Sequence, residues 1–229
     1  EPYTSILRHA AMIRYSLLPF WYTVFYQSYK TGMPVMRTMW QEFPDDAHSL
    51  ELQDQWMIGS SLLVAPVIDR GATHVQVYLP RSHASAKDEK WYNFYTLETI
   101  SSNSPGITTR VDAPMDTIPV FLRSGSIIGR KMRLRRSSKL MHMDPYTLVI
   151  APSTTNEATG YIYMDDEITL AHETKEMYAY MALNFKDNML TIQKLGGSTV
   201  YLPDNTIERI EIAGQTKAPS RVVLMVEGD

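Results

Sequence analysis

The chain has 229 residues, 44% of them hydrophobic and 21% charged, which allows one large domain or two small ones with an ordinary packed core. Its formal net charge of −3 provides no overall attraction to nucleic acid or to an anionic membrane. No apolar run approaches the ~20 residues that a membrane-spanning helix needs, and disulfides contribute nothing because cysteine is absent.

The first long element is a helix predicted over residues 4–30, where apolar side chains recur every three or four positions. Pro19 lies inside this pattern and removes one backbone donor, so the helix should kink or restart near Leu18. Gly32 followed by Pro34 predicts its end. The second half of the helix is aromatic on nearly all sides and therefore needs a partner surface. Since the chain opens directly into this helix, we expect residue 1 to be a cut within a longer polypeptide.

A series of short strands follows the helix, separated by glycine and proline. These strands are predicted over residues 35–40, 56–59, 61–67, 74–80, 91–96, 108–111, 118–123 and 126–128. A loop starts at Pro44, and Ser49 is expected to cap a short helical turn that runs to Gln55. The last two strands flank Ser124 and Gly125 and are predicted to form a hairpin.

A basic stretch over residues 130–139 separates this series from a second one, and we interpret it as a linker between two β modules. The second series is predicted over residues 146–150, 160–164, 177–185, 190–193, 207–212 and 221–226. Many short strands at this spacing are typical of β-sandwiches. Phosphate or nucleic-acid binding is the alternative for the basic stretch, but it holds no interleaved aromatic residue and the chain is acidic overall, which favours a solvated linker.

Few residues form a pattern that could carry chemistry. The six histidines are scattered and predict no metal site, and the sequence has no glycine-rich phosphate loop and no Gly-X-Ser-X-Gly turn. The acidic candidates for general acid–base work are Asp45, Asp46, Asp116, Asp165, Asp166 and Glu167. We interpret the two aspartate pairs as turn formers, because the first follows Pro44 and the second ends a predicted strand.

Five motifs, taken in order, resemble those of glycoside hydrolase family 31. They are RYSLLPFWYTVF at residues 14–25, GMPVMR at 32–37, EFPDD at 42–46, QWMIGSSLLVAPV at 55–67, and YLP followed by WY and Tyr95 within 78–95. Their shared order and spacing argue against chance agreement. The sequence departs from the family pattern at Asn93, Ser124, Gly129 and Glu167, where the family usually has Asp, Gly, Pro and Gly. These departures bear on turn geometry.

The resemblance implies a mainly β fold, with an N-terminal helix from the end of a (β/α)8 barrel followed by two antiparallel β-sandwich domains. The implied parts are the last barrel helix at residues 1–33, a proximal sandwich at 34–136 and a distal sandwich at 137–229, which we expect to be incomplete. Members of the family are retaining α-glucosidases, in which one aspartate is the nucleophile and another the general acid/base. In the family both lie upstream of this helix. We therefore assign no catalytic, cofactor-binding or metal residue here and expect the chain alone to be inactive.

Within the family, residues 130–138 and 113–121 resemble the catalytic α subunits that trim glucose from N-linked glycans in the endoplasmic reticulum lumen. This narrower resemblance implies an oligosaccharide or N-glycan substrate for the parent protein. It also implies a non-catalytic β subunit as a partner, with neither nucleic acid nor a membrane span involved.

Two other interpretations remain open on the sequence. The chain could be a free-standing carbohydrate-binding or interaction module, with exposed aromatic residues such as Trp91 and Tyr92 stacking on sugar. It could also be a small glycosidase that uses Asp45, Asp46 or Asp116. The opening helix favours the fragment of a larger enzyme, because a free module is not expected to begin with a long segment rich in aromatic residues.

Overall fold

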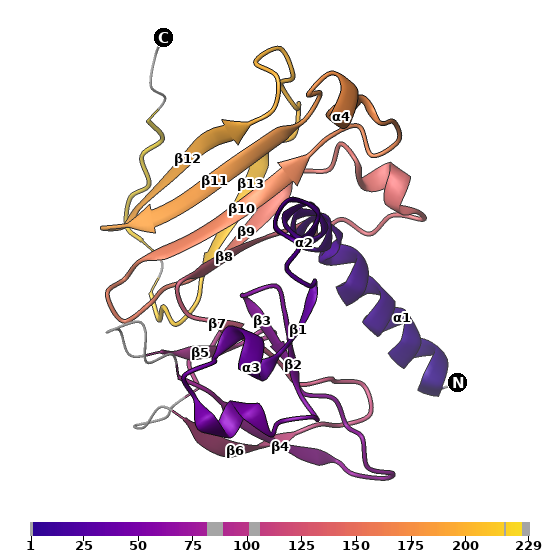
Figure 1. Ribbon diagram of the computed structural model, residues 1–229, viewed down its shortest axis with the longest axis vertical. Coiled ribbons are helices and arrows are strands. Elements are labelled where there is room, and N and C mark those ends of the chain that lie inside the picture. The colour runs from indigo at the N-terminus through magenta and orange to yellow at the C-terminus, as the bar shows by residue number, and fades with distance from the viewer. Residues whose placement is uncertain (1, 82–88, 101–105, 218, 226–229) are drawn as a thin grey trace.

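The computed structural model describes residues 2–81, 89–100, 106–217 and 219–225. Over these ranges the chain is mainly β, with three sheets and few helices, as the sequence predicts. Figure 1 shows a six-stranded sheet above, a five-stranded sheet below it, and one helix seen end-on between the two. No helix in the described part of the chain has both the length and the apolar character that crossing a membrane requires.

The N-terminal helix is broken in two, which confirms the predicted restart. Helix α1 (Pro2–Ser16) ends one residue before α2 (Leu18–Thr31), and Pro19 occupies the first turn of α2, where its missing N–H is tolerated. Gly32 ends α2 in the left-handed conformation (φ 74°), and its N–H donates to the carbonyl of Ser28. Helix α1 extends away from the sheets and is largely exposed, whereas α2 is packed between them.

The first half of the chain forms an antiparallel five-stranded sheet that faces a two-stranded one. The five-stranded sheet has the order β1 (Met36–Thr38), β2 (Trp56–Ile58), β3 (Leu62–Val64), β7 (Val120–Arg123) and β5 (Trp91–Asn93). The two-stranded sheet pairs β4 (His74–Leu79) with β6 (Ile107–Asp112). Buried side chains of both sheets form one core, which includes Met57, Leu63, Val77 and Phe121. The two sheets therefore pack around a shared core, while the predicted bounds of a proximal sandwich stay a prediction.

Two local details differ from the sequence prediction. The strand predicted up to Trp40 ends at Thr38, because the backbone N–H of Thr38 bonds to the side chain of Gln41 and starts helix α3 (Met39–Glu42). Ser49 does not cap the next helical turn. Asp46 caps the 3-10 helix η1 (Ala47–Leu50), and the buried Ser49 hydroxyl donates instead to the carbonyl of Phe43.

The second half forms a single mixed sheet, so the prediction of a second antiparallel sandwich is wrong. Its strand order is β12 (Met189–Gly196), β11 (Ala179–Lys186), β10 (Ala158–Met164), β8 (Ser126–Arg130), β9 (Tyr146–Ala151) and β13 (Ile207–Ile212). The pairs β10–β8 and β13–β9 are parallel. Two short helices, η2 (Ser138–Met141) and α4 (Ala171–Thr174), lie in the connections. The last predicted strand is also wrong over residues 221–225, and Val226 lies outside the described residues.

The predicted hairpin around Ser124 and Gly125 is wrong as well. Strands β7 and β8 belong to different sheets, so this turn carries the chain from the five-stranded sheet into the six-stranded one. Gly125 adopts φ 77°, its N–H donates to the carbonyl of Ala151, and its own carbonyl accepts from Thr159. These bonds fix the turn to β9 and β10 instead of closing a hairpin. The predicted domain division at residues 136–137 stays a prediction, although the chain changes sheets at this earlier turn.

One core cluster joins the two halves of the molecule. It contains Phe20 and Val24 of α2, Leu62 and Leu122 of the five-stranded sheet, and Val149 of the six-stranded sheet. Each of these side chains is at most 6% exposed. The opposite face of the six-stranded sheet has a separate core around Leu148, Ile150 and Leu183. Helix α2 is therefore the element on which both sheets pack.

Gly160 in β10 offers a test of the parallel contact with β8. A Cβ atom at this position would lie 2.1 Å from the carbonyl oxygen of Ile127, which is backbone and cannot rotate away. Gly160→Ala should therefore lower the free energy of unfolding by about 1–3 kcal/mol, measured by urea denaturation. The neighbouring exposed Thr159 provides the control, since Thr159→Ala should change stability by no more than about 0.5 kcal/mol. Equal stability of the two variants would contradict the close approach of these strands.

Candidate functional site

The acidic residues proposed from the sequence lie at separate places in the fold. Asp46 is 8% exposed and accepts the Tyr78 hydroxyl at 2.8 Å and the His48 N–H at 3.1 Å. Burial, followed by the hydrogen bond to Asp46, raises the pKa of Tyr78 above its ordinary value. Asp45 and Asp116 are exposed in turns. The structure therefore gives Asp46 a structural role and does not bring these three carboxylates together with Asp165.

Asp165 lies where α2 meets the six-stranded sheet. It is 3% exposed and accepts hydrogen bonds from the hydroxyls of Tyr22 (2.7 Å to Oδ1) and Tyr163 (2.9 Å to Oδ2) and from the N–H of Glu167 (2.8 Å). Burial is the main cause that raises the pKa values of Tyr22 and Tyr163, and the hydrogen bonds to Asp165 add to it. Both tyrosines therefore remain neutral donors that hold the carboxylate. This cluster was missed at the sequence level.

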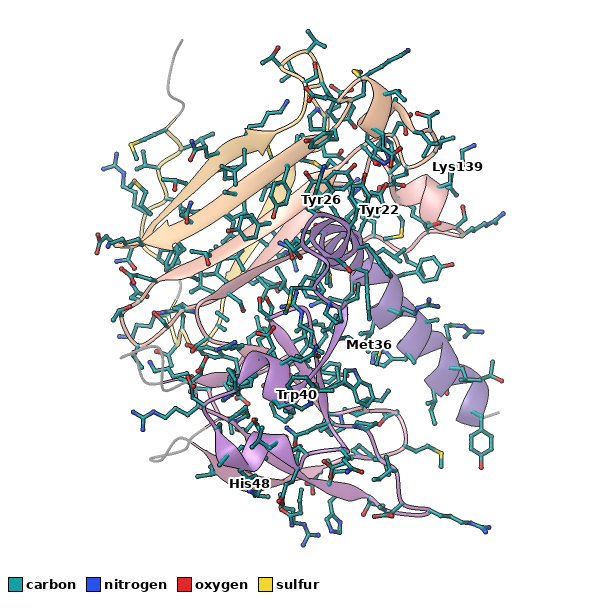
Figure 2. The ribbon with its side chains drawn as sticks, in the orientation of Figure 1. Tyr22, Tyr26, Met36, Trp40, His48 and Lys139 are labelled. Carbon is teal, nitrogen blue, oxygen red and sulfur yellow. The ribbon has the colours of Figure 1, made fainter. Side chains whose placement is uncertain are left out.

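Tyrosine rings continue the same junction along α2. Tyr26 stacks on Tyr163 with ring centroids 4.1 Å apart and planes 14° apart, and it also contacts Tyr178 and Tyr180. Figure 2 shows Tyr22 and Tyr26 on the side of α2 that faces the six-stranded sheet. The hydroxyl of Thr23 accepts the backbone N–H of Tyr163 at 3.0 Å. The junction therefore combines ring packing with hydrogen bonds to a strand.

The loop after Asp165 contains one departure from the family pattern, at a position whose backbone favours glycine. Glu167 adopts φ 57°, a left-handed conformation that glycine tolerates more easily than a residue with a Cβ. Asp166 accepts hydrogen bonds from the Thr169 hydroxyl and from the N–H groups of Thr169 and Ile168. These bonds, with the Thr169 hydroxyl first, lower the pKa of Asp166 to about 2. Asp166 therefore acts as an ionised loop anchor.

The basic stretch does not join two separate modules, because it connects β8 and β9 of one sheet. Residues 132–140 are exposed, as predicted for a solvated stretch, but its first two residues are not. Lys131 is 4% exposed, and its ammonium donates to the carbonyls of Met141 (3.0 Å) and His142 (2.7 Å). Burial lowers the pKa of Lys131. Arg130 lies over the Phe94 ring and donates to the Ser16 hydroxyl of α1 at 3.0 Å. The first two cations of the stretch are therefore used inside the protein.

The aromatic residues proposed for sugar stacking are buried. Trp91 is 4% exposed, and its indole N–H donates to the carbonyl of Pro80 at 3.1 Å. Tyr92 is 3% exposed, and its hydroxyl donates to the carbonyl of Pro152 at 2.6 Å. Neither ring has a free face, so a binding module that stacks sugar on these two residues is excluded. Among the described residues no group of three metal-ligating side chains is found.

A different set of apolar side chains is exposed. It lies on the two helices and on the segment that follows them. Its members are Tyr3 (62% exposed), Leu7 (70%), Phe25 (55%), Tyr29 (64%), Met36 (56%) and Trp40 (48%). Figure 2 labels Met36 and Trp40 below α2, in the half that holds the five-stranded sheet. We call these six residues the helix-side apolar surface. Large exposed apolar side chains on two successive helices are available for contact with another part of a protein.

The Asp165 cluster predicts a measurable contribution of one hydroxyl. Tyr22→Phe removes a hydrogen bond to a buried carboxylate and should lower the free energy of unfolding by about 1.5–3 kcal/mol in thermal or urea denaturation. Tyr29→Phe is the matched control, because the Tyr29 hydroxyl is exposed and 3.3 Å from Glu173. A Tyr22→Phe protein as stable as the control would show that the cluster does not hold α2.

The pair Arg135–Asp144 predicts a pH dependence of stability. The Arg135 guanidinium donates to both Asp144 oxygens, with the shortest distance 2.6 Å, and this hydrogen bonding lowers the pKa of Asp144 below its ordinary 3.8. A carboxyl with a lowered folded-state pKa adds stability above its unfolded pKa, and this stability is lost as pH falls through the folded value.

Arg135→Gln should therefore reduce stability at pH 6, and the difference from the unsubstituted chain should shrink as the pH falls below 3.8. Unfolding curves between pH 6 and acid pH check this result. Arg136→Gln is the control, because Arg136 is exposed and has no ion pair among the described residues. A difference that stays constant with pH would overturn the assignment of the effect to Asp144.

Comparison with known proteins finds relatives that align over nearly the whole chain. A family model for the glycosyl hydrolase family 31 C-terminal domain matches residues 32–128. Neutral alpha-glucosidase AB of Dictyostelium discoideum is 40% identical over 222 residues, which cover 96% of this chain and 23% of that protein. A probable glucan 1,3-alpha-glucosidase of Oryza sativa subsp. japonica is 36% identical over 98% of the chain and 24% of its own length.

Solved structures agree with the sequence relatives. A glucosidase II alpha subunit superposes with a TM-score of 0.85 at 33% identity, over 96% of this chain and 24% of that one. The same similarity, with a TM-score of 0.84, extends to a heterodimeric complex of the endoplasmic reticulum glucosidase II catalytic subunit with the binding domain of its regulatory subunit. This chain thus spans about a quarter of the relatives that it matches. It belongs to glycosyl hydrolase family 31 and matches the C-terminal region of the family's α-glucosidases.

Proposed function

We propose that this chain is the C-terminal β part of a retaining α-glucosidase that removes terminal α-linked glucose during N-glycan trimming in the endoplasmic reticulum lumen. In this proposal residues 1–33 are the last helix of the catalytic barrel, and the two β regions that follow brace it. The catalytic aspartates are supplied by the rest of the longer protein. The similarity to glucosidase II alpha subunits supports the substrate class, and the similarity to an endoplasmic reticulum glucosidase II complex supports the location.

The observation that carries the bracing role is the two-sided character of the helices. Helix α2 buries Phe20 and Val24 against the sheets, while Phe25 and Tyr29 remain more than half exposed on it. Helix α1 exposes Leu7 and has few contacts within the chain. A helix that is apolar on more than one side is stable when a second surface covers it. We infer that the barrel is this second surface.

The chemistry of the described carboxylates agrees with a supporting role. Retaining hydrolysis uses two carboxyl groups about 5–5.5 Å apart, one as nucleophile and one as acid/base. Asp46 and Asp165 belong to different halves of the fold, and tyrosine hydroxyls hold each of them. We also propose that the longer protein binds a non-catalytic regulatory subunit, since one structural relative is a complex of this kind.

An activity assay tests the assignment of the chemistry. Hydrolysis of p-nitrophenyl α-glucoside should be absent in this chain alone and present in the longer protein that contains it. Activity of the isolated chain that is lost in an Asp46→Asn or Asp116→Asn variant would overturn the proposal and favour a small glycosidase.

A stability measurement on the same two proteins tests the bracing role. Leu7→Gln should leave the stability of the isolated chain within about 0.5 kcal/mol, because Leu7 is 70% exposed there. In the longer protein it should lower stability by about 1–3 kcal/mol, because a buried apolar contact is replaced by a polar group. Arg8→Gln, on the same exposed helix, is the control for helix propensity. Equal effects of Leu7→Gln in both proteins would show that α1 has no covering surface.

A further inference from the structure

A pocket lies on the flank of α2 away from the Asp165 cluster. Its volume is about 400 Å³, within the range of small-molecule sites. Its lining comes from α2, the turn between β2 and β3, the turn between β7 and β8, and the start of β10 with the loop before it, together with Glu89. Phe20, Val24 and Ile127 provide its apolar lining. These elements come from both halves of the fold, and Figure 1 shows that α2 lies where the two sheets meet.

The charged groups of this pocket already have partners. Arg123 forms ion pairs with Glu89 and, at 3.4 Å, with Glu42. Glu157 forms an ion pair with Lys186 at 2.9 Å. A charged ligand would therefore have to compete with an existing ion pair for its counter-charge. The pocket is suited to a neutral ligand.

The pocket also presents hydroxyl groups that have no hydrogen-bond partner among the described residues. The hydroxyls of Ser60, Ser61 and Thr159 make no hydrogen bond to any described residue, although all three residues line the pocket. By contrast, the Ser126 hydroxyl donates to the carbonyl of Arg123 at 2.5 Å. Each free hydroxyl can both donate and accept, which matches a ligand whose own groups do the same.

The aromatic ring of Tyr161 also lines the pocket. Tyr161 is 39% exposed and stacks on Tyr180 with centroids 5.2 Å apart and planes 10° apart. The Tyr180 hydroxyl accepts the side-chain amide of Gln27 at 3.1 Å, and Gln27 also lines the pocket. This contact fixes the orientation of the two rings. A fixed flat ring beside hydroxyl groups is a surface for the apolar C–H face of a sugar.

We propose that this pocket binds one neutral sugar unit without hydrolysing it. The sugar hydroxyls bond to Ser60, Ser61 and Thr159, and its C–H face packs on Tyr161. The site is separate from the helix-side apolar surface, so it does not depend on the bracing role.

Titration of the ¹⁵N-labelled chain with maltose tests the proposal. Amide signals of residues 60–61 and 159–161 should shift and saturate, with a Kd on the order of 1–10 mM. Glucuronate, the charged analogue of glucose, should bind at least about tenfold more weakly, because the charges of the pocket are already paired. No saturable shift with maltose, or shifts confined to other regions, would overturn the proposal. Equal binding of glucuronate would overturn the neutral ligand class.

Two substitutions with matched controls locate the site. Thr159→Val removes one hydroxyl at constant shape and should weaken maltose binding about threefold to tenfold. Thr108→Val, at an exposed strand threonine outside the pocket, should leave it unchanged. Tyr161→Leu should weaken binding by a similar or larger factor, while Tyr95→Leu serves as its control, since Tyr95 has nearly the same exposure (38%). Far-UV circular dichroism confirms folding, and unchanged affinity in both folded pocket variants would overturn the proposal.

The result is independent of the assay for hydrolysis. Sugar binding by an inactive chain agrees with both proposals. Hydrolysis by the chain alone would overturn the proposal that the catalytic residues lie in the rest of the longer protein. It would not affect the sugar-binding proposal. Absence of binding would overturn the sugar-binding proposal and would not affect the proposed family function.

Discussion

The structure depends on the burial of one face of α2 between two sheets. Phe20 and Val24 are almost completely buried in a core to which the five-stranded and six-stranded sheets both contribute. Burial of apolar side chains is the main favourable term in folding. Thr23, between them, accepts a hydrogen bond from the backbone of Tyr163, so the same helical face carries a directional contact. Without α2 the two sheets would lose the surface that they share.

The strands and the helix break could be predicted from the sequence because their causes are local. Short apolar runs separated by glycine and proline predict strands well, and Pro19 predicts where α2 begins. Which strands pair with each other is not determined by the local sequence. Ser124 and Gly125 have the composition of a hairpin turn, yet β8 pairs with β9 and β10 because those strands offer it neighbours on both sides. The parallel pairs of the six-stranded sheet were missed for the same reason.

The contacts of the site residues could not be predicted from local sequence either. Tyr22 and Tyr26 are four residues apart on a helix, and Tyr163 and Asp165 are two apart on and just after a strand, so each pair lies on one face. Nothing local indicates that these two faces meet. The partners of Lys131 could not be predicted, because a charged side chain is usually solvated, whereas this ammonium donates to two carbonyls inside the protein. Composition can identify such a residue, but only the fold shows its partners.

The bond between Thr23 and Tyr163 joins residues that are 140 positions apart. During synthesis α2 leaves the ribosome long before its strand partner is made, and at about 5–20 residues per second the delay is roughly 7–28 s. Throughout this interval the aromatic face of the helix has no sheet to cover it. Contacts of such large sequence separation also slow folding once the chain is complete. The nascent chain therefore exposes an aromatic helix face for several seconds, and exposed apolar surface of this kind is what chaperones bind.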